Sequence, residues 1–308
     1  MKIKGLIKAA IGQAYGLRRK YLLKDTFSVF VYHDVTNAPS PWSKTYGLNV
    51  RPDIFDFQIG FIKRHFNVIS PDDLLGGRIP DRAALVTFDD GLKNVFIHAV
   101  PILERHGIPA IIFMNMAPVR GEIFWSGLIT YLCEKRPDFV EYLGTQIEKP
   151  DNRALFLHCS KTIVESYLKK TGQDFGSEIR RFVGELASGK DLKDASQGRF
   201  LFYGNHLYNH HVALLMSDDE LLDSFNTNAA ALAKYPNSRS LFAFPFGQPG
   251  MCFSQRQVDL LLANGAEKVF SAYDSINADA SSPYLHRMGF QEHHNSPSLM
   301  WYRIFHRR

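Results

Sequence analysis

The chain has 308 residues, of which 45% are hydrophobic and 22% are charged, and these values are ordinary for a globular protein. This length suits one large barrel-like domain or two ordinary domains, with a core that needs no disulfides. The 36 Lys and Arg residues exceed the 31 Asp and Glu residues only slightly, and no dense basic tract with interleaved aromatic residues lies in the folded region. Nucleic acid is therefore not an expected partner.

The three cysteines, Cys133, Cys159 and Cys252, are odd in number, and none belongs to a Cys-x-x-Cys pair. This pattern argues against a disulfide framework or a thiolate zinc site and fits a reducing compartment. No stretch is apolar for long enough to cross a membrane, and the first residues do not have the pattern of a secretory signal. We therefore expect a cytoplasmic protein.

Residues 1–26 are predicted to form a basic amphipathic helix, because lysine and arginine alternate there with isoleucine and leucine. Such a helix can lie on an anionic membrane surface. It can equally pack on the outside of the domain. The sequence leaves both interpretations open, so peripheral contact of residues 1–24 with the inner face of a membrane is one of two expectations.

From residue 27 onward, short apolar runs alternate with patterns of helical periodicity. Strands are expected at residues 27–35, 66–70, 84–88, 108–114, 199–203, 240–244, 268–272 and 284–290. Helices are expected at residues 53–64, 92–106, 217–234 and 254–263. This alternation predicts right-handed βαβ units and a parallel sheet. We therefore predict an α/β fold over residues 27–295, a distorted (β/α) barrel of about seven parallel strands.

Strand character disappears between residues 126 and 197, where charged segments of helical spacing replace it. These segments lie at residues 128–135, 160–170 and 177–186. We interpret the region as a helical insertion in the barrel. Residues 296–308 are expected to form a C-terminal tail.

The segment from Ala84 to Gly91 is an apolar strand that ends in two adjacent carboxylates, Asp89 and Asp90. In parallel α/β folds, chemistry takes place at the C-terminal ends of the strands. Two adjacent like charges destabilise each other unless a cation holds one or the other keeps a proton, and a metal ion is the simplest remedy. The alternative, a helix N-cap beside a solvated turn acid, explains one acid better than the other.

A pair of histidines, His206 and His210, follows the strand at 199–203. Their spacing would place both imidazoles on one side of a helical turn, where they can share a metal ion. This pair, like Asp89 and Asp90, lies just past the end of a predicted strand. One carboxylate and two neutral imidazoles form an open catalytic site for zinc or a similar divalent ion.

A third strand end carries Phe244-Pro245-Phe246-Gly247. Proline and glycine shape a tight turn there, and the backbone N–H of Phe246 could point into the mouth of the barrel as an oxyanion donor. A plain turn is the alternative interpretation.

Three motifs therefore occur in order along the chain: Thr87-Phe88-Asp89-Asp90-Gly91, Gly204-x-His206-x-x-x-His210 and Phe244-Pro245-Phe246-Gly247. Together they resemble the polysaccharide deacetylases of the nodulation-protein type, carbohydrate esterase family 4. The resemblance covers roughly residues 27–290 without the helical insertion, and it implies a distorted (β/α) barrel. Carried over residue by residue, it implies that Asp90, His206 and His210 bind the metal and that Asp89 is the general base. The implied metal is zinc, with nickel or cobalt as alternatives.

The general acid is implied by a further resemblance, to biofilm poly-N-acetylglucosamine deacetylases, which look like a permuted version with the acid in an N-terminal Tyr-His-Asp segment. Tyr32-His33-Asp34 matches that segment, so His33 is the expected acid and His286 is the alternative. From their positions at strand ends, Arg287 could supply the cation that keeps Asp89 ionised, and Asp274 could orient the acid histidine.

The chain departs from the family pattern at two motif residues and lacks a cation. Leu207 replaces the usual Ser or Thr, Phe246 replaces the usual Tyr, and no Arg precedes Pro245. Trp125 and Tyr208 suit stacking on sugar faces, and Pro245 is expected with them at the substrate.

The resemblance implies a metal-dependent hydrolase that removes an N-acetyl group from an amino sugar. The substrate would be a glycan or a lipid- or nucleotide-linked precursor of a surface polysaccharide. An O-acetyl esterase or deformylase with the same site is one alternative, and a catalytically silent glycan-binding protein is another. We expect the protein to act in the cytoplasm, at the inner membrane face if residues 1–24 bind there.

Overall fold

A computed structural model describes residues 2–147 and 155–306 of the protein. Its strands are β1 (Phe27–Tyr32), β2 (Asp34–Val35), β3 (Asn49–Val50), β4 (Asn67–Val68), β5 (Ala83–Phe88), β6 (Ala110–Met114), β7 (Leu201–Asn205), β8 (Ser238–Ala243), β9 (Lys268–Phe270), β10 (Tyr284–Leu285) and β11 (Met288–Gly289). Its α-helices are α1 (Lys2–Leu22), α2 (Pro41–Thr45), α3 (Pro52–His65), α4 (Pro71–Leu75), α5 (Val100–His106), α6 (Met116–Val119), α7 (Trp125–Lys135), α8 (Pro137–Gln146), α9 (Lys161–Thr171), α10 (Gly176–Val183), α11 (Gly189–Ala195), α12 (Asp218–Leu232), α13 (Gln255–Ala263) and α14 (Pro297–Phe305). Shorter turns are the π-helical η1 (Val95–Ala99) and the 3-10 turns η2 (Leu155–His158) and η3 (Ala213–Leu215).

Within the described residues, nine strands form one parallel sheet in the order β10-β9-β8-β7-β6-β5-β1-β11, with β4 also paired to β5. The two strands at the ends of this order, β10 and β11, are separated in the chain only by His286 and Arg287. The sheet therefore curls until its two edges meet in one segment, which pairs first with β9 and then with β1. This arrangement confirms the predicted α/β fold and its distorted barrel.

The strands beside the site are buried along their whole length, as their apolar sequences predict. Alternate residues of β5 enter different cores. Leu85 belongs to the cluster inside the barrel with Val29 and Phe113, and Val86 belongs to the cluster under the outer helices. Since side chains alternate along a strand, Thr87 and Asp89 continue the inward-facing row that Leu85 begins. The end of β5 thus aims Asp89 into the mouth of the barrel.

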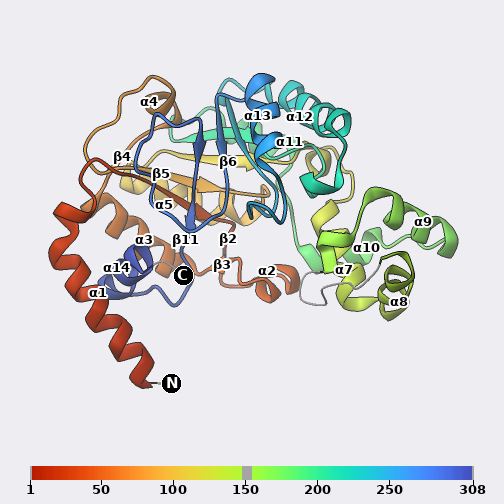
Figure 1. The fold of residues 1–308 in the computed structure, drawn as a ribbon, viewed down its shortest axis with the longest axis horizontal. Helices are drawn as coiled ribbons and strands as arrows, with labels where there is room; N and C mark the ends of the chain where they lie inside the picture. The colour runs from red at the N-terminus through yellow and green to blue at the C-terminus, as the bar shows by residue number, and fades with distance from the viewer. Residues whose placement is uncertain (1, 148–154, 307–308) are drawn as a thin grey trace.

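Helices occupy most of the predicted insertion, and α7 to α10 lie to one side of the barrel (Figure 1). The sequence pattern did not single out α8 and α11. Cys133 and Cys159 are 26 residues apart in the chain, but their Sγ atoms lie 3.8 Å apart as free thiols. The insertion therefore folds back on itself and brings distant segments together.

The first helix, α1, packs against the last, α14, so the segment expected as a C-terminal tail contains a helix. Two glycines allow this close approach. A Cβ atom added to Gly12 would lie 1.8 Å from the carbonyl oxygen of Ser298, and one added to Gly16 would lie 2.7 Å from the Trp301 ring. None of the described helices combines the length and the apolar character needed to span a bilayer.

We predict that Gly12→Ala separates α1 from α14, because the new methyl group meets backbone atoms that cannot move aside independently. Overpacking of this kind costs about 1–3 kcal/mol. Gly5→Ala is the matched control, since no atom lies within 4 Å of its Cβ position. Limited proteolysis followed by mass spectrometry should show faster cleavage of α1 in Gly12→Ala only. Equal cleavage rates in the two variants would contradict this packing.

Candidate active site

Three residues from distant parts of the chain converge at the C-terminal edge of the sheet. Asp90 follows β5, whereas His206 and His210 follow β7. Oδ1 of Asp90 lies 3.0 Å from Nε2 of His210 and 3.7 Å from Nε2 of His206. One ligand atom from each residue lies within 4.8 Å of the others, and all three side chains are buried.

The backbone that presents these residues is a strained loop, which corrects the expectation of a helical turn. Residues 206–212 have no helical assignment, and Leu207 and His210 have φ angles of 59° and 61°. Asp90 and Phe246 also have positive φ, at 69° and 59°. Side chains other than glycine rarely adopt this conformation. Such strain is typical of functional sites, because surrounding contacts must hold it in place.

His206 has the tautomer that a metal ligand needs. Its Nδ1 lies 2.7 Å from the carbonyl oxygen of Ala243, and since a carbonyl only accepts, Nδ1 carries the proton. The lone pair of Nε2 then faces Asp90. Burial lowers the pKa of His206 to about 4, so the ring is neutral at physiological pH. A hydrogen bond to a backbone carbonyl from the second ring nitrogen is usual for metal-binding histidines.

The Oδ1 atom of Asp90 is buried, and Nε2 of His210 lies 3.0 Å from it. Burial raises the pKa of this carboxyl, but the hydrogen-bonding contact with His210 and the charges of the neighbouring histidines lower it by more, so the pKa of Asp90 lies well below the usual range. A buried, ionised carboxylate that faces two imidazole nitrogens suits a bound cation.

The spacing of the donor atoms also fits a metal ion. A tetrahedral ion with bonds of about 2.0–2.2 Å holds its ligand atoms about 3.4 Å apart. The distances from Asp90 to His210 and His206, 3.0 and 3.7 Å, bracket this value. Both distances from Asp90 therefore suit a divalent ion of the kind that oxygen and imidazole ligands bind, and all three ligand atoms lie within 4.8 Å of one another.

Three buried asparagines that the sequence analysis missed hold the histidine loop in place. Asn115 donates from Nδ2 to the carbonyl oxygens of His206 and Leu207. The Asn205 side chain accepts the N–H of Leu207 at 3.0 Å and also accepts from Asn228 at 2.8 Å. These bonds replace the helical hydrogen bonds that the loop lacks. No spacing pattern in the sequence predicts them.

The second carboxylate, Asp89, is paired with Arg287, which lies in the segment between β10 and β11 that closes the barrel. Nη1 and Nη2 of Arg287 donate to the two carboxylate oxygens at 2.7 and 2.8 Å. The guanidinium is fully buried and also donates to Thr87 Oγ1 and to the carbonyl oxygen of Ser271. Burial raises the pKa of Asp89, but the Arg287 charge more than offsets it, so the pKa of Asp89 lies below its usual value. This geometry agrees with the expectation that Arg287 keeps Asp89 ionised.

We predict that Arg287→Met destabilises the fold by about 3–5 kcal/mol, because it leaves the Asp89 charge buried without a partner. The double variant Arg287→Met with Asp89→Asn removes both charges and should recover part of this loss. Urea unfolding followed by tryptophan fluorescence measures the free energy of unfolding of each variant. A double variant no more stable than Arg287→Met would show that the ion pair is not the source of the effect.

A cavity of about 310 Å³ lies over these residues. Its walls come from the barrel mouth, from the segment around α2 and from the insertion. They consist of His33, Trp42, Tyr46, Leu48, Asp89, Asp90, Ser126, Thr130, Phe156, His206, His210, Phe246, Gln248 and Ala272. The insertion thus supplies one wall of the cavity above the candidate metal ligands.

The two candidate acid histidines lie in different surroundings. His33 lines the cavity, its side chain is 27% exposed, and its Nε2 lies 3.8 Å from Oδ2 of Asp89. His286 does not line it. Its Nδ1 pairs with Ser271 Oγ at 2.8 Å, and since it precedes the inward-facing Arg287 in the closing segment, it points to the other side. Only His33 is placed beside the candidate metal ligands.

Asp274, expected to orient the acid histidine, instead pairs with Arg303. Nη1 of Arg303 donates to its carboxylate at 2.9 Å, and no hydrogen bond joins Asp274 to His33 in the described part of the chain. The partner of Asp274 is therefore the guanidinium of Arg303, and not the acid histidine that was expected. Strand-end position alone could not distinguish these partners.

The expected sugar-stacking residues do not face the cavity over the metal ligands. Trp125 is 8% exposed and stacks on His211 with ring centroids 4.3 Å apart, so this contact supports the histidine loop and takes up one face of the ring. Pro245 is buried in its turn and is also absent from the cavity walls. Phe246, by contrast, packs edge-on against His210 inside the cavity.

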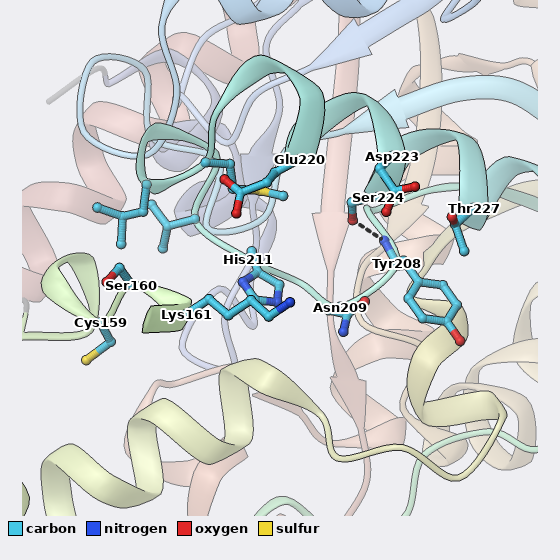
Figure 2. A pocket seen from close by; sticks show the side chains of 13 residues that line it. Cys159, Ser160, Lys161, Tyr208, Asn209, His211, Glu220, Asp223, Ser224 and Thr227 are labelled. Carbon is cyan, nitrogen blue, oxygen red and sulfur yellow. Dashed lines mark hydrogen bonds between the residues drawn. The ribbon is translucent and has the colours of Figure 1, made fainter. Parts of the chain in front are cut away.

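Tyr208 faces a separate cavity of about 300 Å³ on the other side of the histidine loop. Figure 2 shows His211 next to Lys161 of the insertion, and Tyr208 further along the cavity near Ser224 and Asp223 of α12. The N–H of Tyr208 donates to Ser224 Oγ at 3.0 Å, which ties the loop to α12. Tyr208 therefore helps to fix the loop that carries His210. The sequence analysis placed it at the substrate and did not predict its position in this second cavity.

No protein-family model matches the chain, and no curated protein matches its sequence. Solved structures do match it. The Streptococcus pyogenes deacetylase PplD, solved with acetate, aligns over 91% of this chain and 98% of its own, with a TM-score of 0.60 and 16% identity. IcaB from Ammonifex degensii aligns over 91% of this chain and 97% of its own, with a TM-score of 0.57 and 17% identity. A de-N-acetylase from Aggregatibacter actinomycetemcomitans aligns over 90% and 99%, with a TM-score of 0.59 and 14% identity.

These similarities extend over almost the full length of both chains in each pair. At such low identity they establish a shared fold. The chain therefore shares the α/β fold of these solved structures, with a buried Asp-His-His group where its parallel strands end.

Proposed function

We propose that the protein is a metal-dependent hydrolase that removes an N-acetyl group from an amino sugar. The sugar would belong to a glycan or to a lipid- or nucleotide-linked precursor of a surface polysaccharide. The observation that carries the proposal is the buried group of Asp90, His206 and His210 beside a second, separately paired carboxylate. A fold shared with deacetylases supports the same reaction class.

In this mechanism Asp90, His206 and His210 hold the metal, with zinc as the first candidate and nickel or cobalt as alternatives. When bound, such an ion polarises a carbonyl oxygen and lowers the pKa of water. The chain supplies ligands that need little rearrangement, because His206 is already neutral with its proton on Nδ1. This preorganisation favours metal uptake at neutral pH.

Asp89 acts as the general base and takes the proton of the attacking water. The Arg287 ion pair keeps it ionised and fixes its orientation. His33 lies on the other side of Asp89, 3.8 Å from its Oδ2, and lines the same cavity. His33 therefore donates the proton to the leaving amine, as in the biofilm deacetylases that the Tyr32-His33-Asp34 segment resembles.

The oxyanion is stabilised in part by the backbone N–H of Phe246. No acceptor in the described part of the chain takes up this N–H, while the next residue, Gly247, donates to the Pro245 carbonyl at 2.7 Å. The positive φ angle of Phe246 sets the direction of its peptide groups. A backbone donor fixed before the reaction costs no reorganisation when charge develops.

The proposal includes a cytoplasmic location. It is supported by the three free cysteines, which include the neighbouring thiols of Cys133 and Cys159. Cysteines without a disulfide partner fit a reducing compartment.

We predict that the zinc-loaded protein releases acetate from N-acetylated chitooligosaccharides and exposes one free amine for each acetate. Asp89→Asn should lower the rate by about 10²–10⁴-fold, the usual contribution of a general base, with the zinc content unchanged. Asp219→Asn, in the first turn of α12, is the control and should keep full activity. Acetate assay, amine labelling and metal analysis together make the measurement.

The same assay separates the two candidate acids and the rival functions. His33→Ala should lose activity to a similar extent, and His286→Ala should retain most of it; the reverse result would exchange their roles. Turnover of acetyl esters without turnover of amides would assign the site to an esterase. Glycan binding with no turnover of any substrate would reject the enzyme assignment.

A further inference from the structure

The two faces of α1 differ in what covers them. The face toward α14 carries the buried or half-buried residues of the helix, which are Ala9, Gly12, Tyr15, Gly16 and Arg19. With 3.6 residues per turn, the residues opposite Gly12 and Gly16 form a second stripe that we call the outer face of α1. It consists of Leu6, Ile7, Ala10, Ala14, Leu17 and Tyr21.

The outer face is apolar and open to solvent. Leu17 and Tyr21 are 79% and 85% exposed, and Leu6 and Ile7 are 70% and 54% exposed. Figure 1 shows α1 along the edge of the molecule, with its N-terminal turns extending beyond α14. Single exposed apolar side chains are common on proteins. A row of four on one helix face, over four turns, indicates a surface that another phase or molecule covers.

The charge of this helix is equally one-sided. Residues 1–24 contain seven Lys and Arg and no Asp or Glu. The other residues have 29 Lys and Arg, which is 36 less these seven, against 31 Asp and Glu. All of the excess positive charge of the chain therefore lies in this segment. Exposed Arg18 and Lys20 border the outer face on its two sides, with Lys4 and Lys24 near its ends.

We propose that the outer face of α1 is a docking surface for an anionic lipid bilayer. An apolar stripe bordered by cations is the pattern of a helix that lies in the interface of a membrane, and each basic residue near the surface adds attraction to anionic lipids. A second copy of the chain fits this face poorly, because pairing two outer faces would bring two wholly basic helices together.

The test is co-sedimentation of the full chain with vesicles of phosphatidylcholine alone or mixed with phosphatidylglycerol. The wild-type protein should bind the anionic vesicles at least about tenfold more strongly than the neutral ones. The double variant Leu17→Glu/Tyr21→Glu should lose at least about tenfold of this binding, because it places two acids in the apolar stripe. Ile97→Glu is the matched control, since Ile97 is 51% exposed but lies in η1, and it should bind like the wild type.

Circular dichroism and thermal unfolding of each variant ensure that a loss of binding does not reflect unfolding. Equal binding to both kinds of vesicle, or undiminished binding by the double variant, would overturn the proposal. So would a wild-type dimer, detected without lipid by sedimentation equilibrium, that the double variant converts to a monomer, because the face would then belong to a second copy. Acetate release from a soluble oligosaccharide should be the same in the wild type and the double variant, which separates failure of docking from failure of the deacetylase assignment.

Discussion

The site depends on one electrostatic constraint, the burial of two adjacent carboxylates at the end of β5. Asp89 and Asp90 are 3% and 4% exposed, so each must be neutralised separately. The positive φ angle of Asp90 turns the backbone between them, and the two carboxylates meet different partners. Arg287 binds Asp89 from the segment that closes the barrel, and the imidazoles after β7 surround the open oxygen of Asp90. Barrel closure and formation of the candidate metal site are therefore coupled through one pair of acids.

Much of the fold could be predicted because its signals are local. Buried parallel strands have continuous apolar sequences, and the strand ends at Asp89 and His206 coincide with abrupt changes to polar residues. The meeting of Asp90 with the two histidines followed from the rule that parallel strands end at one edge. The assumed helical turn was wrong, since tertiary hydrogen bonds from Asn115 and Asn205 hold a strained loop instead. Partners such as Asn228 and Arg303 could not be predicted, because the pattern around Asn228 indicates only a helix and Arg303 lies in the segment expected as a C-terminal tail.

Two of the departures from the deacetylase motifs, at Leu207 and Phe246, have different physical effects. Leu207 is fully buried in an apolar cluster with Val212 and Phe244, so the loss of a hydroxyl there alters packing behind the loop and leaves the cavity lining unchanged. Phe246 lines the cavity, where it contacts His210 and stacks on Phe156 of the insertion. A phenyl ring offers no hydrogen-bonding group, so this part of the cavity wall is apolar.

The central claim is that Asp90, His206 and His210 share one divalent ion, and X-ray absorption spectroscopy of the zinc-loaded protein tests it most directly. A shared ion predicts nitrogen and oxygen neighbours at about 2.0–2.2 Å, with outer-shell scattering from two imidazole rings that disappears in His206→Ala/His210→Ala. Sulfur neighbours at about 2.3 Å, or a spectrum without imidazole scattering, would contradict it.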